Sequence, residues 1–183
     1  MMSYIETERL VLRRFMAQDA AHLFEYLHTP TASCFLSLAL ADIKAAQAEV
    51  IKRAAEEKYM GICLKESGAL IGDLFVEPEE DPFSDGTFSI GWNLNPRFSG
   101  QGYAIEAATA LVNHLFSVKK ARRLYAYVET TNHPSARLCE KLGMRLEGVF
   151  KEFVTFKNDH EGRPVYEDTM QYALLRKEWK SPN

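Results

Sequence analysis

The segment NPRFSGQGYAIEAATALVNHLF, residues 95–116, constrains the fold most, because two glycines and an arginine lead directly into an uninterrupted helical pattern. Its apolar residues recur at spacings of three and four, at Ile105, Ala108, Leu111, Val112, Leu115 and Phe116. A helix packed along that face would start at a fixed point, near Gly100, with its first N–H groups unpaired. Together with the helix dipole, these groups favour an anion. The segment therefore predicts a rigid helix start that can hold phosphate.

Gly100 and Gly102 alone are compatible with more than one kind of turn. A dinucleotide-binding GxGxxG/A fingerprint requires a small residue where Ile105 stands, and a P-loop requires a Gly-Lys-Ser/Thr sequence that the segment lacks. Both of these phosphate sites are excluded. The residues by themselves leave either another phosphate-binding turn or a glycine-rich turn that binds no ligand.

The rest of the chain alternates between strand and helix patterns. A strand in TERLVLRRF precedes helices in AQDAAHLFEYL and over residues 42–58, the latter with Asp42 as N-cap. YMGICLK and ALIGDLFVEP are expected to form a hairpin, and TFSIGWNL is expected to form the strand before residue 95. A strand in RRLYAYVE, a short helix closed by Gly143 and strands over residues 145–156 and 165–175 complete the pattern. The order β-α-α-β-β-β-α-β-α-β-β predicts an α/β (α+β) fold with about seven strands and four helices.

Composition narrows the class of protein. The 183 residues are 46% hydrophobic and 26% charged, as expected for one globular domain spanning residues 1–183. No apolar run is long enough for a membrane span, and Glu6 and Glu8 interrupt the place of a signal peptide, so a cytoplasmic protein without membrane contact is expected. Three scattered cysteines predict reduced thiols and no metal site. A net charge of -3 disfavours direct binding of nucleic acid.

The glycine-rich turn and the stretches around it resemble the motifs of a known enzyme family. The motif R-x-x-G-x-G/A occurs here as Arg97-Phe98-Ser99-Gly100-Gln101-Gly102-Tyr103-Ala104. It resembles the acyl-CoA pyrophosphate loop of the GCN5-related (GNAT) N-acetyltransferases, and the element order matches that fold along nearly the whole chain. LRRF with Asp19, IGWNLNPRFSGQGYAIEA and ETTNHPSARLCEKLGMRLEGVF look like the RimJ/RimL-like branch, which acetylates the N-termini of ribosomal proteins.

The resemblance implies a mixed, mostly antiparallel sheet that splays open beside residues 88–94, with acetyl-CoA in the gap. The pantetheine arm would pair with the backbone of Trp92, Asn93 and Leu94, and a backbone N–H near Asn93 or Leu94 would polarise the thioester carbonyl. The pyrophosphate would bind the amides of residues 98–104, where Arg97 either adds charge or only shapes the turn. Asn132 matches a position that hydrogen-bonds the pantetheine arm, although an ordinary cap residue has the same pattern.

The chemistry requires a neutral amine and a donor for the departing thiolate. An α-amine, with a pKa of about 7.7 to 8.0, is roughly a tenth neutral at pH 7, so it demands little of a base. Glu152 matches a glutamate frequent in this branch and could relay the proton through water, or it could be a solvent-facing acid. Many relatives carry a tyrosine where Cys139 stands. The N-terminal-acetylating branch often has serine at the position of Ser135, which we expect to hydrogen-bond the sulfur, with Cys139 in reserve.

The acceptor stays open at this point. The expected reaction is direct attack by a protein N-terminal α-amine in a ternary complex, with a ribosomal protein as the leading acceptor. A small-molecule amine, such as a polyamine, an amino sugar, an antibiotic or an amino acid, is the alternative, and a non-catalytic acyl-CoA-binding module is a third. Trp92 is a candidate for the acceptor wall, whereas Tyr26 and Phe35 are expected to pack in the core. Either a monomer or a homodimer is compatible with the sequence.

Overall fold

The computed structural model describes residues 4–180, so the two ends of the domain predicted over residues 1–183 lie outside the described residues. The helices and strands follow one another as β1 (Ile5–Glu6), β2 (Leu10–Arg13), η1 (Ala17–Asp19), α1 (Ala20–Leu27), η2 (Ser33–Leu38), α2 (Ile43–Ala55), β3 (Tyr59–Leu64), β4 (Leu70–Pro78), η3 (Pro82–Ser84), β5 (Thr87–Leu94), η4 (Pro96–Phe98), α3 (Tyr103–Ser117), β6 (Arg123–Glu129), α4 (His133–Lys141), β7 (Arg145–Asn158) and β8 (Pro164–Leu175). None of the helices within residues 4–180 is long and apolar enough to cross a membrane.

The eight strands form one sheet in the order β1-β2-β3-β4-β5-β6-β8-β7. Every neighbouring pair is antiparallel except β5 and β6. The predicted mixed, mostly antiparallel sheet with four α-helices is confirmed. The structure has one strand more than the seven predicted. This additional strand is β1, which has only two residues and pairs with β2 at the sheet edge.

The sheet opens between β5 and β6. Their parallel ladder contains only three pairs, from Thr87 opposite Arg123 to Ser89 opposite Tyr125. Beyond these pairs β5 continues to Leu94 and β6 to Glu129 without pairing to each other, while each keeps its antiparallel partner on its far side. The sheet thus has the splay that the resemblance implied.

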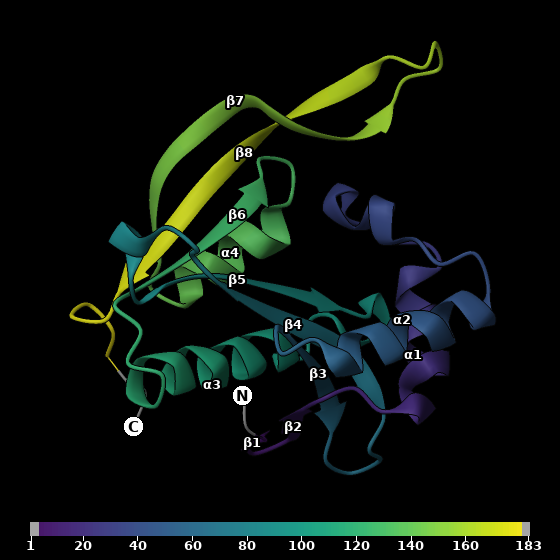
Figure 1. Cartoon of the computed structure of the whole chain (residues 1–183), viewed down its shortest axis with the longest axis horizontal. Helices are drawn as coiled ribbons and strands as arrows, with labels where there is room; N and C mark the ends of the chain where they lie inside the picture. Colours follow the sequence, from purple (N-terminus) through teal and green to yellow (C-terminus); the bar gives the residue numbers. More distant parts are fainter. Residues whose placement is uncertain (1–3, 181–183) are drawn as a thin grey trace.

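Helices cover both faces of the sheet (Figure 1). Ile62 and Ile71 belong to the core that contains α3, whereas the adjacent Cys63 and Leu70 belong to the core that contains α1 and α2. Successive side chains of a strand point to opposite faces. The α3 core and the α1/α2 core therefore lie on opposite faces of β3 and β4, and α3 is held against the sheet by its buried side.

Local signals placed most elements within a few residues. Asp42 caps α2, because its carboxylate accepts a hydrogen bond from the Ala45 N–H at 2.8 Å. The helix expected near Gly100 begins instead at Tyr103, since Gly102 adopts a φ of +83° as the N-cap residue. The three residues before it therefore belong to the turn and not to the helix.

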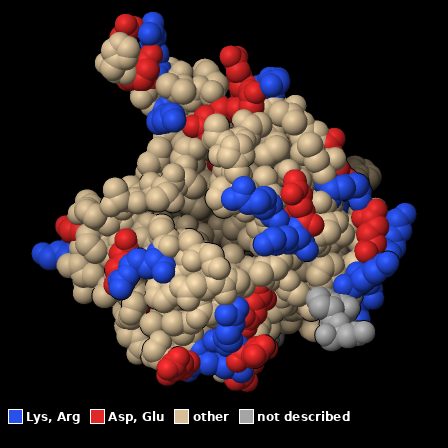
Figure 2. Space-filling model, turned by 180° about the vertical axis from the view of Figure 1, so that it is seen from behind, with Lys and Arg blue, Asp and Glu red and all other residues tan. Residues whose placement is uncertain are grey.

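A long hairpin, β7 and β8, projects past the rest of the molecule (Figure 1). The 3-10 helix η2 faces it, and the Ser33 hydroxyl donates to Glu167 of β8 at 2.6 Å. Seen from behind, the surface is hollowed, with charged side chains of both signs around the hollow (Figure 2). The hairpin and η2 thus bound a recess at the open end of the sheet.

Candidate active site

A cavity of about 490 Å³ lies between the end of β5, the start of α3 and α4. Of the residues predicted to hold the cofactor, its walls contain Trp92, Asn93, Leu94, Phe98, Ser99, Gly100, Gly102, Tyr103, Ala104 and Asn132. We call this space the cofactor cavity. It brings together the end of β5, the turn before α3 and Asn132, which the resemblance implied would surround the cofactor.

The start of α3 gives the cofactor cavity an end whose geometry and charge favour an anion. Gly100 and Gly102 have φ values of +76° and +83°, a left-handed conformation that strains any residue with a Cβ. The first N–H groups of α3 are free of helical partners because the helical hydrogen bonds begin with the Glu106 N–H donating to Gly102. Arg137 and Lys141 add positive charge to the walls. Glycines, helix dipole and cations all favour phosphate here.

Arg97 and Gln101 lie outside the walls of the cofactor cavity. The Arg97 guanidinium is 73% exposed and pairs with Glu25 at 3.2 Å, while the Arg97 N–H donates to the Asn95 side chain. The Gln101 carbonyl accepts a hydrogen bond from Arg9 at 3.0 Å. Both residues hold the turn in place in the structure as it stands.

The backbone of β5 points alternately toward β4 and into the splay. The Asn95 N–H donates to the Ile71 carbonyl at 2.8 Å, and the ladder continues without a shift from Leu94 opposite Gly72. In an antiparallel pair every second residue faces away from its partner strand. The N–H groups of Trp92 and Leu94 therefore face the splay, whereas that of Asn93 faces β4, so Leu94 is the better placed of the two amides expected to polarise a carbonyl.

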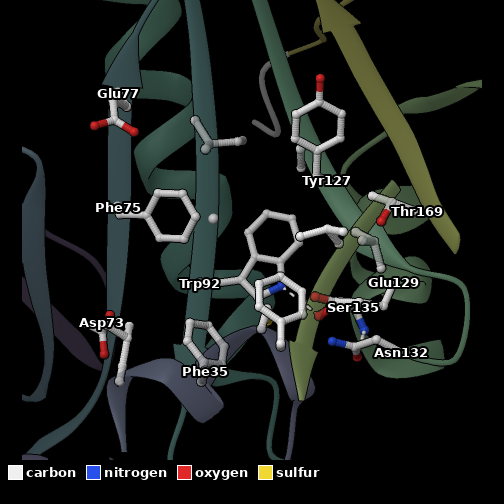
Figure 3. A pocket seen from close by; sticks show the side chains of 18 of the residues that line it. Phe35, Asp73, Phe75, Glu77, Trp92, Tyr127, Glu129, Asn132, Ser135 and Thr169 are labelled. Atoms are coloured by element: carbon white, nitrogen blue, oxygen red, sulfur yellow. Dashed lines mark hydrogen bonds between the residues drawn. The ribbon is translucent and has the colours of Figure 1, made fainter. Parts of the chain in front are cut away.

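A second cavity, of about 380 Å³, also has Trp92 in its wall. Asp73, Phe75 and Glu77 line one side from β4, and Tyr127, Glu129 and Thr169 line the other from β6 and β8 (Figure 3). Phe35 of η2 contributes to the walls of both cavities, so it is not a pure core residue as expected, whereas Tyr26 is buried. We call this second space the acceptor cavity.

The two cavities share Phe35, Trp92, Asn132 and Ser135. Trp92 Nε1 donates to Ser135 Oγ at 3.2 Å (Figure 3). This bond uses a lone pair of the hydroxyl, so the Ser135 O–H is left to donate elsewhere. Asn132 Oδ1 accepts from the Ser135 N–H as the N-cap of α4, which leaves the Asn132 amide nitrogen for another partner. The junction of the cavities therefore offers two donors to a molecule bound there.

Cys139 and Glu152 lie away from this junction. The Cys139 side chain is fully buried among the core residues, and burial raises its thiol pKa to about 12. Glu152 is exposed, has a φ of +47°, and lies in an irregular part of β7 between Phe150 and Val154, where its N–H donates to Asp168. Neither residue lines the acceptor or the cofactor cavity.

A buried charge network supports the β4 side of the acceptor cavity. Arg53, 1% exposed, lies 3.0 Å from Asp73 Oδ1, and its Nε donates to Glu49 at 2.8 Å. The Tyr26 hydroxyl donates to the other Asp73 oxygen at 2.8 Å. Burial raises the pKa of Asp73, and burial together with the Asp73 charge raises that of Tyr26. The arrangement fixes this wall and keeps Tyr26 protonated.

Sequence patterns missed Asp73, Arg53, Glu129 and Thr169 as site residues. An acid inside the apolar run ALIGDLFVEP was the one available signal, because buried acids are rare unless they are paired. Glu129 ends a strand, and Thr169 gives no local signal at all. Within residues 4–180, no group of three or more His, Cys, Asp or Glu side chains is arranged to hold a metal ion.

Comparison with known proteins agrees with this geometry. Residues 9–145 match the family described as the acetyltransferase (GNAT) domain. The uncharacterized N-acetyltransferase YnaD of Bacillus subtilis (strain 168) is 31% identical over 178 residues, which cover 96% of this chain and 99% of YnaD.

Solved structures show the same fold. A GNAT-family acetyltransferase from Bacillus anthracis superposes with a TM-score of 0.84 at 30% identity, covering 96% of this chain and 100% of its own. The ribosomal-protein-S5-alanine acetyltransferase of Vibrio fischeri shares the fold with a TM-score of 0.73 at 17% identity, covering 98% and 100%. The chain therefore belongs to the GNAT acetyltransferases and is an N-acetyltransferase, of a family that uses acetyl-CoA as acyl donor.

Proposed function

We propose that the enzyme transfers the acetyl group of acetyl-CoA to the N-terminal α-amine of a polypeptide, with a ribosomal protein as the leading acceptor. The observation that carries this proposal is the meeting of two cavities at Ser135 and Trp92. One cavity has the phosphate-favouring start of α3 in its wall, and the other is a separate space that shares Trp92 and Ser135 with it. An acyl donor in one cavity and an amine in the other can thus meet at this junction without a covalent enzyme intermediate.

Each part of the donor has a matching group in the chain. The α3 N–H groups, with Arg137 and Lys141, would bind the pyrophosphate, and the unpaired β5 backbone and the Asn132 amide would hold the pantetheine arm. The Leu94 N–H would stabilise the oxyanion that forms when the nitrogen attacks the carbonyl carbon. Ser135 would hydrogen-bond the sulfur as the C–S bond breaks.

An α-amine fits the site better than a lysine side chain. Roughly a tenth of an α-amine is neutral at pH 7, compared with about 0.04% of a lysine amine. Glu152, the base suggested by the sequence, lies outside both cavities, and an α-amine depends less on such a base than a lysine amine does. The Vibrio fischeri protein that shares the fold is named for acetylating a protein alanine.

A thiol-release assay with acetyl-CoA tests the proposal. The acceptors are short peptides with free alanine, serine, leucine or methionine N-termini, the same peptides with blocked α-amines, spermidine and an aminoglycoside. The proposal expects turnover with free peptides and none with blocked ones. Turnover confined to spermidine or the aminoglycoside would contradict it.

A further inference from the structure

The acceptor cavity contains one carboxylate that lacks a counter-charge. Its charged wall residues are Arg53, Lys58, Asp73, Glu77 and Glu129. Asp73 pairs with Arg53 at 3.0 Å, and Glu77 pairs with Lys58 at 3.3 Å. Within residues 4–180, no ion pair joins Glu129 to a lysine, an arginine or a histidine. After pairing, the cavity has an excess of one negative charge, on Glu129.

Burial makes this unmatched charge costly. Glu129 is only 7% exposed. The thiol of Cys34 lies beside it, and burial together with the Glu129 charge raises the pKa of that thiol. A neutral thiol is a weak donor and does not replace a cation. A buried carboxylate of this kind is stabilised only by a cation or by several strong donors.

Thr169 is a second, independent sign of a missing partner at the same wall. It is 3% exposed, lines the acceptor cavity, and its Oγ1 is buried without a hydrogen-bond partner among residues 4–180. Thr169 is directly opposite Glu129 in the β6–β8 ladder, so their Cβ atoms are about 5 Å apart on one face. Figure 3 shows both side chains on the same side of the cavity. One ammonium group, with three N–H donors, could satisfy both.

The position and the surroundings of this wall define the rest of the ligand. Asn132 and Ser135, at the junction with the cofactor cavity, line the same space as Glu129. Half of the remaining wall residues are aromatic, namely Phe35, Tyr59, Phe75, Trp92, Tyr127, Phe153 and Phe156, and most of the others are aliphatic. An amine bound by Glu129 would therefore lie near the acyl donor. The side chain next to that amine would lie against an apolar surface.

We propose that Glu129 and Thr169 bind the acceptor's ammonium group as its single charge in this cavity, and that the aromatic walls bind a large apolar group beside it. This rests on the proposed function and narrows it to the α-amines of polypeptides whose first residue has a large apolar side chain, such as leucine or methionine. Polyamines and aminoglycosides carry several positive charges, whereas the cavity offers only one unpaired carboxylate, so they should bind poorly. The bound ammonium must lose one proton before its nitrogen attacks, and Glu129 is a carboxylate that can accept it.

Steady-state kinetics at saturating acetyl-CoA test the assignment. The acceptors are peptides that differ only in an N-terminal leucine or glycine, together with spermidine. Glu129→Gln should raise the KM for the leucine peptide about 10- to 100-fold, as expected for a lost charge-assisted hydrogen bond, and leave the KM for acetyl-CoA within about twofold. Thr169→Val should raise the acceptor KM about 2- to 10-fold without lowering the melting temperature, because its hydroxyl has no protein partner. Glu129→Asp should recover part of the affinity.

A matched control is Glu140→Gln on α4, an exposed acid outside both cavities, which should leave all constants unchanged. Equal kcat/KM values for the leucine peptide, the glycine peptide and spermidine would overturn the proposal. So would a Glu129→Gln enzyme whose acceptor KM stays within twofold of wild type.

Calorimetry with CoA present separates this inference from the proposed function, because it does not require turnover. Leucine amide should bind wild type at least 10-fold more tightly than 4-methylpentanamide, which lacks the amine, and Glu129→Gln should abolish that difference. Binding that ignores the amine, or a difference that survives in Glu129→Gln, overturns the inference. If peptides are not acetylated but this difference is found, the proposed function fails and the ammonium site stands.

Discussion

Replacing Ser135 by alanine tests whether its hydroxyl assists departure of the thiolate. The Trp92 indole already donates to Ser135 Oγ at 3.2 Å, so the hydroxyl proton is free to point at the sulfur. The cap of α4 survives the change, because it uses the backbone N–H of residue 135 and the Asn132 side chain. Loss of one donor is therefore the main effect of the substitution.

The size of the effect follows from the charge of the leaving sulfur. A hydrogen bond to a charged group contributes about 1.5–3 kcal/mol. The sulfur becomes negative only as the C–S bond breaks, so the loss should appear in kcat and not in acetyl-CoA binding. At about 1.4 kcal/mol per tenfold change, kcat should fall about 10- to 150-fold, with the KM for acetyl-CoA changed by less than about threefold.

The measurement is thiol release at saturating acetyl-CoA and acceptor, with melting curves to show that each variant is folded. Cys139→Ala is the control, since that thiol is fully buried in the core and lines neither cavity. It should retain kcat. If Ser135→Ala turned over like wild type while a folded Cys139→Ala lost all activity, the donor would be Cys139 and the reasoning would be wrong.

Three further predictions concern stability and cofactor binding. Asp73→Asn removes one of the two carboxylates that pair with the buried Arg53 and leaves Glu49, so unfolding should become easier by about 1.5–3 kcal/mol, or roughly 3–12 °C in calorimetric melting temperature, and a drop under about 2 °C would contradict this. Burial raises the pKa of Glu106, but bonds from the Thr7 hydroxyl and from the Arg9 N–H and guanidinium outweigh it and lower that pKa overall. The stabilisation by Glu106 is therefore present above its unfolded pKa of about 4.3 and is lost as pH falls through its lower folded pKa. In urea titrations, the unfolding free energies of wild type and Glu106→Gln should converge between pH 7 and pH 3. A difference that stays constant over this range would refute the prediction. Gly102→Ala forces a Cβ into a φ of +83° at the start of α3, so calorimetry should show acetyl-CoA affinity reduced about 10-fold, and unchanged affinity would exclude the pyrophosphate from this turn.

Local patterns predicted the elements well because caps, turns and periodicity act over a few residues. The Asp42 cap of α2 is such a case. The strand β1 was missed, since two residues paired at a sheet edge show no periodicity. The start of α3 was placed too early because only the backbone angle of Gly102 decides where the helix begins.

Site residues were predictable where they lie in one motif and not where the sheet brings them together. Ser135 lies in the short helix α4 and Asn132 caps it, at a recognisable spacing, and both line the junction of the cavities. Glu129 and Thr169 meet through the register of β6 and β8, which the sequence does not state. Glu152 was expected beside the reacting amine, but its neighbour Phe153 lines the acceptor cavity instead. The pairing of β7 with β8 shifts between Phe150 and Val154, and such a bulge changes which side chains face inward.

The short ladder between β5 and β6 has an evolutionary consequence. Under the proposed function, the thioester and its arm are held largely by main-chain groups, which most substitutions leave unchanged. The amine is chosen by side chains such as Glu129 and the aromatic walls, each of which a single codon change can replace. Selection can therefore alter the acceptor while the acyl donor and the chemistry persist, as expected for a fold retained between chains only 17% identical.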